Sequence, residues 1–117
     1  MNIHQDVIDG TTLIAPQGRI DTTTSGPLEE SIRKAVDGGA RELLVDFAHV
    51  DYISSAGLRV FLALAKRMRD LNGRLVLCGM TQPVRQVFQL AGFMPLFTVE
   101  RSRESALRKV SPGETAF

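Results

Sequence analysis

The sequence of 117 residues contains few of the residues that specialised sites require. It has one cysteine, Cys78, two histidines and no tryptophan. A lone cysteine cannot form an internal disulfide, and it excludes a metal site built from several cysteines. Because Cys78 lies in the apolar segment 75–79, we expect it to be a small buried apolar residue.

Neither sign of charge is in excess, and long apolar runs are missing. Fourteen Lys and Arg stand against thirteen Asp and Glu, which gives a net charge of +1. This balance does not favour nucleic acid as a partner. No apolar run reaches membrane-spanning length, and the first ten residues lack the apolar block of a signal peptide. We therefore expect a cytoplasmic protein without membrane insertion.

The composition is that of an ordinary globular chain. Hydrophobic residues make up 44% of the sequence and charged residues 23%. A chain of this length is expected to fold as one domain, 1–117. We place its core at about 3–110 and expect a mobile tail at 111–117.

Turn residues and periodicity divide the chain into strands and helices. Asp9-Gly10 favours a tight turn, which predicts an antiparallel hairpin between strands at 2–8 and 11–15. Short apolar runs at 43–47 and 74–79 are typical of strands covered on both faces. Helical spacing predicts helices that end at Gly38-Gly39, Asn72-Gly73 and Gly92, and the C-terminal part should form a short strand at 97–99 and a helix at about 102–110.

The helix that follows Ser54 and Ser55 carries two apolar stripes rather than one. One stripe can pack on the sheet, whereas the second could be buried or could bind a partner; periodicity does not decide between them. The first stripe contains Leu58, Phe61, Leu62, Ala65 and Met68, and the second contains Val60, Leu64 and Leu71.

The alternation of strands and helices predicts an open α/β sheet. The sheet should be mixed, mainly parallel, entered by the antiparallel hairpin and packed with about four helices. Functional sites in such sheets lie at the carboxyl ends of the strands. In this sequence those ends are followed by the loops Asp46–Ser55 and Gly79–Gln82.

Ser54 and Ser55 stand where a strand gives way to a helix. A helix start has unpaired N–H groups and partial positive charge, so it can accommodate a phosphate. A serine there can also act simply as a helix cap. Capping does not explain the four small residues 54–57, which allow another molecule to approach the backbone closely. The junction is therefore a candidate phosphoserine switch.

Enzymatic and metal-binding interpretations find less support. Ser55-Ala56-Gly57 matches half of a hydrolase nucleophile elbow, but Ile53 replaces the first glycine, and only His4 and His49 could serve as a base. No metal-binding or phosphate-binding motif is present, so any ATP would arrive on a partner. The carboxylates are expected to be solvated, as are the cationic side chains of two helices. These cationic residues are Lys66, Arg67, Arg69, Arg101, Arg103, Arg108 and Lys109.

Two segments resemble a known family. Gly18-Arg19-Ile20-Asp21 and the segment 51–59, DYISSAGLR, are similar to the STAS domain of bacterial anti-sigma factor antagonists, and the resemblance extends from about Ile3 to Val110. Family members usually read Asp-Ser-Ser-Gly-Leu or Asp-Ser-Thr-Gly-Leu at the junction, and the residue after the aspartate takes phosphate. Alignment on Gly57-Leu58 gives that position to Ser55. Ser54 then replaces the aspartate and remains an alternative site, while Ala56 replaces the second hydroxyl residue.

The resemblance implies a partner switch. The unphosphorylated protein would bind an anti-sigma factor that is also a GHKL-type serine kinase, and so release the sigma factor. The kinase would use its own ATP to phosphorylate Ser55, and a serine phosphatase would reverse this. The protein would be neither an enzyme nor a cofactor carrier. An alternative is an unphosphorylated STAS subunit of a transport ATPase or a signalling assembly.

The resemblance also implies partner contacts around Ser55. Asp21 would pair with a kinase cation or cap the following helix. Gly57 would allow close approach, and Leu58 would anchor the helix or touch the partner. The implied contact residues are Asp21, Ser54, Ser55, Ala56, Gly57, Leu58, Met80 and Thr81.

Overall fold

The computed structural model describes residues 1–110, and the predicted mobile tail lies outside them. It contains four α-helices, one short 3-10 helix and six strands in this part of the chain. Their order is β1 (Asn2–Ile8), β2 (Thr11–Ile20), α1 (Ser25–Asp37), β3 (Glu42–Asp46), β4 (Val50–Ile53), α2 (Ser55–Asp70), β5 (Arg74–Cys78), α3 (Gln82–Leu90), η1 (Met94–Leu96), β6 (Thr98–Glu100) and α4 (Arg103–Val110).

The strands form one mixed sheet. Its order is β1-β2-β3-β5-β6, with β4 paired beside the end of β2. The β1–β2 pair is antiparallel, and all other pairs are parallel. Asp9 and Gly10 form the turn between β1 and β2 with φ angles of 51° and 85°, as expected for a two-residue hairpin. The predicted mixed α/β fold and the central position of β3 are confirmed.

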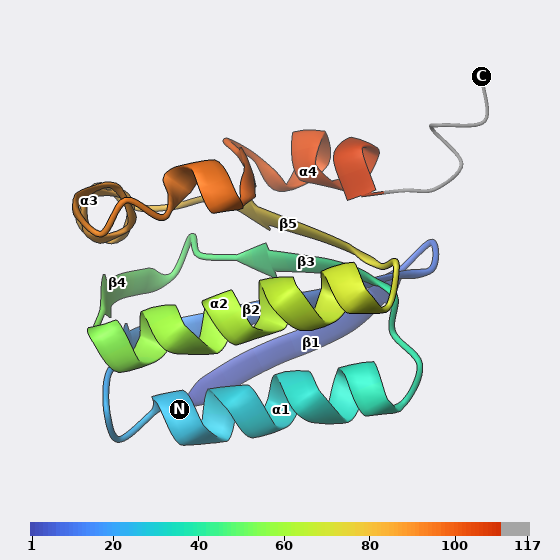
Figure 1. Cartoon of the computed structure of the whole chain (residues 1–117), viewed down its shortest axis with the longest axis horizontal. Coiled ribbons are helices and arrows are strands. Elements are labelled where there is room, and N and C mark those ends of the chain that lie inside the picture. Colours follow the sequence, from blue (N-terminus) through green and yellow to red (C-terminus); the bar gives the residue numbers. More distant parts are fainter. Residues whose placement is uncertain (111–117) are drawn as a thin grey trace.

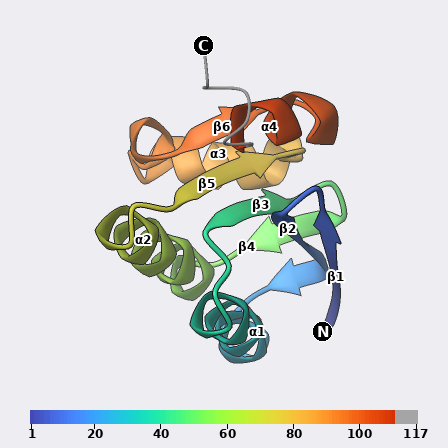
Figure 2. The same cartoon turned by 90° about the vertical axis from the view of Figure 1, so that its right-hand side faces the viewer.

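Helices cover both faces of the sheet. Figures 1 and 2 show α1 and α2 side by side on one face and α4 on the other. Neighbouring strand residues point to opposite faces, so Leu44 packs in the smaller core under α4, while Val45 belongs to the larger core. Cys78 is fully buried in the smaller core, as predicted. Double coverage explains why β3 and β5 read as nearly continuous apolar runs.

The second apolar stripe of α2 packs against α1. Val60 and Leu64 are buried and line the same hollow between the helices as Ile32 and Val36. The second stripe is therefore packed within the domain and does not form a partner-binding surface. No helix among residues 1–110 is both long and apolar enough to cross a bilayer.

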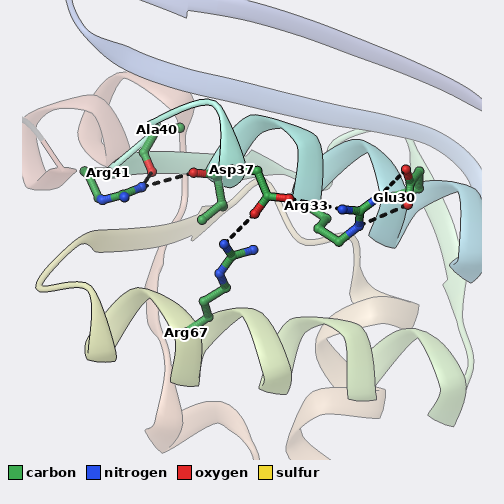
Figure 3. A network of polar contacts seen from close by, with 7 residues as sticks. Glu30, Arg33, Asp37, Ala40, Arg41 and Arg67 are labelled. Carbon is green, nitrogen blue, oxygen red and sulfur yellow. Dashed lines mark hydrogen bonds and ion pairs between the residues drawn. The ribbon is translucent and has the colours of Figure 1, made fainter.

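An exposed ion-pair network joins α1 and α2 (Figure 3). Asp37 of α1 accepts from Arg67 of α2, and Arg33 pairs with both Asp37 and Glu30. Arg41 donates to the Val36 carbonyl in the last turn of α1 and to the Ala40 carbonyl in the loop that follows. Arg67 lies on a solvated face of α2, as predicted, with 42% of its side chain exposed, but its guanidinium also binds Asp37. Such exposed pairs typically contribute less than about 1 kcal/mol each.

The predicted loop between β3 and α2 contains a strand. Val50–Ile53 forms β4, which pairs with β2 through Gly18, Arg19 and Ile20. Strand β2 is accordingly longer than the expected 11–15 and reaches Ile20. This pairing carries the chain directly to the start of α2.

Candidate functional site

The site lies where β2, β4 and α2 meet. Strand β4 ends at Ile53, and α2 begins two residues later at Ser55. The Ser54 N–H donates to the Ile20 carbonyl over 2.8 Å, which ties the junction to the end of β2. Asp21 follows Ile20 immediately, so the two segments singled out in the sequence converge at one edge of the sheet (Figure 1).

The two serines have different environments. Ser54 has extended backbone angles and is the N-cap of α2, and its hydroxyl accepts from the Gly57 N–H over 3.2 Å. Its side chain is only half-buried, but its oxygen is engaged in the cap. Ser55 is the first residue of α2 and is exposed. Capping therefore explains Ser54 and leaves Ser55 as the more accessible hydroxyl.

Of the small residues after the serines, Gly57 serves internal packing. A Cβ atom at Gly57 would lie 2.6 Å from Ile20 Cγ2 and 2.8 Å from Ile53 Cγ1. Gly57 is buried, so the close approach it permits is that of α2 to the two strand ends and not that of a partner. Leu58 is 5% exposed and belongs to the larger core. Ala56, by contrast, is half-buried.

Asp21 fixes the turn that precedes α1. Its Oδ1 atom accepts from the Thr23 hydroxyl at 2.7 Å, the Thr23 N–H at 2.9 Å and the Thr24 N–H at 3.2 Å. These bonds, led by the Thr23 hydroxyl, lower the pKa of the Asp21 carboxyl. The N-cap position of α1 belongs to Thr24. Asp21 therefore organises the turn rather than capping the helix itself.

A stacked pair beside Asp21 was not found from the sequence. Arg19 and Tyr52 are neighbours in the β2–β4 register, and the Arg19 guanidinium lies 4.2 Å from the centre of the Tyr52 ring. Arg19 Nε also lies 3.7 Å from Asp21 Oδ2. Tyr52 is exposed, so this cation–π pair forms part of the surface near Ser55. The contact could be predicted only from the pairing of β4 with β2, whereas the sequence predicts a loop for the β4 residues.

The loop after β5 is fixed to β4. The Thr81 hydroxyl donates to the Val50 carbonyl over 2.8 Å. Met80 is half-buried and packs against the larger core. The loop thus lies at the same edge as the serine junction, as predicted, but the Thr81 hydroxyl is already used within the chain.

A partly buried ion pair joins the end of β3 to the start of α4 at this edge. The Asp46 side chain is 8% exposed, and its Oδ2 accepts from Arg103 Nη2 at 2.9 Å and Nε at 3.1 Å. Its Oδ1 accepts from the Ala48 N–H. The prediction of solvated carboxylates was wrong for Asp46. Arg103, predicted on a solvated cationic face, is 39% exposed but binds this buried carboxylate. Gly79, with φ +68°, has no room for a side chain because a Cβ would lie 2.5 Å from Asp46 Oδ1.

The environment of this pair makes Cys78 a poor nucleophile. Burial, and next the charge of Asp46, raise the pKa of its thiol to about 12. Within residues 1–110, no three His, Cys, Asp or Glu side chains are grouped to hold a metal ion. The chemical feature that stands out at the edge is therefore the exposed hydroxyl at the start of α2.

Comparison with known proteins identifies the family. The model of the STAS domain matches residues 2–106. The chain belongs to the STAS family. This STAS domain is 42% identical over 106 residues to BtrV of Bordetella bronchiseptica, which is described as a candidate anti-sigma factor antagonist; the match covers 91% of each chain. It is also 25% identical to the anti-sigma-B factor antagonist of Staphylococcus aureus, across 89% of this chain and 96% of the relative.

Solved structures share the fold. The anti-sigma factor antagonist SpoIIAA in its unphosphorylated form superposes with a TM-score of 0.79 at 23% identity, covering 93% of this chain and 96% of the other. An anti-sigma factor antagonist of Mycobacterium paratuberculosis gives a TM-score of 0.86 at 23% identity, with coverage of 93% and 92%. The Bacillus SpoIIAA in its phosphorylated form gives a TM-score of 0.72 at 22% identity, with coverage of 94% and 100%.

Proposed function

We propose that this STAS domain is an anti-sigma factor antagonist controlled by phosphorylation of Ser55. The observation that carries the proposal is that one serine caps the helix and the other is exposed. Ser54 Oγ is bonded to the Gly57 N–H, whereas Ser55 is exposed at the first position of α2. The names of the relatives support the antagonist role, and SpoIIAA, which shares the fold, occurs in phosphorylated and unphosphorylated forms.

In the unphosphorylated state, the surface around Ser55 binds an anti-sigma factor that is also a serine kinase of the GHKL type. The start of α2 contributes an exposed hydroxyl flanked by the half-buried Ala56. The stacked Arg19 and Tyr52 lie at the neighbouring strand ends, and Asp21 offers its Oδ2 atom. Occupation of the kinase by this surface releases the sigma factor.

Phosphorylation then breaks the complex. The Ser55 oxygen attacks the γ-phosphorus of ATP bound to the kinase, a new O–P bond forms, ADP leaves, and the hydroxyl proton passes to a base of the kinase. The product carries about −1.5 to −2 additional charges. The start of α2 tolerates these charges because its N–H groups and the helix dipole favour an anion. The free energy of partner binding becomes less favourable, because the phosphate must lose its water on contact with a partner surface that binds a neutral serine.

The remaining parts of the cycle lie with the partners. A serine phosphatase hydrolyses the phosphoserine and restores binding. The STAS domain itself catalyses no reaction and needs no cofactor, since the nucleotide is held by the kinase. We place the cycle in the cytoplasm, where ATP is available.

The test is phosphate transfer from labelled ATP by candidate anti-sigma factor kinases. The wild type should be labelled at Ser55, as located by mass spectrometry, and Ser55→Ala should bind the kinase without being labelled. Ser54→Asp is the matched control, because aspartate keeps the N-cap while removing the hydroxyl; it should still be labelled. Label on Ser54 would contradict the assignment. An unlabelled protein that still binds a larger assembly would favour the unphosphorylated STAS subunit.

A further inference from the structure

Strand β1 forms an edge of the sheet along its whole length. All seven of its residues pair with β2 in a regular register, and among the described elements none pairs with its other side. Figure 2 shows β1 at the border of the molecule, away from β5 and β6. A regular edge strand of this length presents N–H and C=O groups that another strand can complete.

The outward-facing backbone groups belong to Ile3, Gln5 and Val7. The Val7 N–H donates to the adjacent Asp6 carboxylate over 2.8 Å and not to β2, so it faces the open edge. Alternate residues of an antiparallel strand direct their backbone groups to the same side, which gives Ile3 and Gln5 the same orientation. Ile3 lies opposite Pro16, which has no N–H to donate across the β1–β2 pair.

The residues of β1 complement one another when the strand is reversed about Gln5. We propose that two copies of this chain pair antiparallel through β1, with a two-fold axis between their Gln5 residues. Ile3 then faces Val7 of the second copy, and His4 faces Asp6 of the second copy. A two-fold axis between the two Asp6 residues would instead place their carboxylates face to face and pair fewer residues of the two strands. The sequence and the orientation of the strand therefore select one register.

Pairing would bury the exposed Val7 side chain and give the Val7 N–H a strand carbonyl in place of the Asp6 carboxylate. Val7 is 64% exposed and would pack on Ile3 of the second copy, which itself packs against the larger core. The Val7 N–H would donate to a strand carbonyl, and Asp6 would turn from that N–H to His4 of the second copy. The switch sites remain open, because the two-fold axis points the carboxyl ends of the two parallel sheets in opposite directions.

Cysteine cross-linking tests the register. In Gln5→Cys the two thiols face each other with Cα atoms about 5.5 Å apart, within the range of a disulfide. Val7→Cys is the matched control on the same strand and face, but its thiols would be displaced by four residues along the strands, or about 13 Å. Under mild oxidation, Gln5→Cys should form covalent dimers at least about tenfold faster. The buried Cys78 should not compete. Equal rates for both variants would overturn the proposal.

Sedimentation equilibrium tests the association itself. The wild type should approach twice its mass of 12.8 kDa as concentration rises. His4→Asp should weaken the dimer by placing carboxylates opposite Asp6, and the double exchange with Asp6→His should restore it. Asp70→Lys, a charge change outside β1, should leave the dimer unchanged. A wild type that remains monomeric at the highest soluble concentration, or a double variant no better than His4→Asp, would refute the pairing. Labelling of Ser55 does not depend on this result.

Discussion

Replacement of Gly57 with alanine probes how closely α2 approaches the ends of β2 and β4. The new methyl group would lie 2.6 Å from Ile20 Cγ2 and 2.8 Å from Ile53 Cγ1, distances that require the neighbours to move. Both isoleucines are essentially inaccessible, with 0% and 1% exposure, so they cannot turn into solvent. Overpacking of this kind costs about 1–3 kcal/mol. Two contacts below 3.0 Å with inaccessible atoms place the cost in the upper half of that range, about 2–3 kcal/mol. Alanine returns about 1 kcal/mol through its helix propensity, which leaves a net loss of about 1–2 kcal/mol.

Gly26→Ala provides the matched control. Gly26 also lies in the first turn of a helix, but a Cβ there meets no atom within 4 Å. The same substitution should therefore stabilise the protein by about 0.4–1 kcal/mol. Thermal unfolding followed by circular dichroism measures both changes, and for a domain of this size 1 kcal/mol shifts Tm by roughly 4 °C. If Gly57→Ala unfolded at or above the temperature of the wild type, the tight junction derived for α2 would be refuted.

Four further changes test other parts of the structure. Leu58→Asp should lower the free energy of unfolding by about 3–5 kcal/mol or prevent folding, because it places a carboxylate in the core; an unchanged melting curve would contradict the burial of Leu58. Ser55→Asp should keep the wild-type Tm yet bind the kinase about tenfold or more weakly in a titration, and equal affinity would count against the switch. Arg103→Ala should cost about 1–2 kcal/mol in denaturant unfolding, since Asp46 loses its cation while staying buried. The pKa of the Asp21 carboxyl is lowered in the folded protein, so the carboxylate stabilises the fold above the ordinary carboxyl pKa. This stabilisation is lost as the pH falls through the lower folded pKa, and the Tm difference between wild type and Asp21→Asn should therefore shrink from about pH 5 to pH 3. A Tm difference independent of pH would refute this.

The sequence predicted elements whose signals are local. The Asp9-Gly10 turn and the apolar runs of β3 and β5 were sufficient because each pattern reflects the environment of its own segment. Strand β4 was missed because only Val50 and Ile53 of its four residues are buried, which gives neither alternation nor a continuous apolar run. Its existence depends on pairing with β2, some thirty residues earlier in the chain.

In the candidate site, too, local features were predicted and features that depend on the folded contacts were not. The position of the serine junction followed from the order of strand and helix, but the separate roles of Ser54 and Ser55 depend on which backbone N–H each oxygen faces. The burial of Asp46 was also beyond reach, since its partner Arg103 lies 57 positions later. A single charged residue beside an apolar run is more often at a solvated strand end, so the sequence alone favoured the wrong environment.

The hydrogen bonds at the start of α2 explain why a phosphate there need not disturb the fold. Two of the first-turn donors are already engaged, because the Gly57 N–H binds Ser54 Oγ and the Leu58 N–H binds the Ser54 carbonyl. A phosphate on Ser55 is therefore offered the N–H groups of Ser55 and Ala56, the two donors that precede them. The Ser54 cap and the Ile20 bond would stay intact with a phosphate on Ser55, because they organise the helix start in the unmodified chain. In the proposed switch, the added charge would therefore weaken binding of the partner rather than unfold the domain.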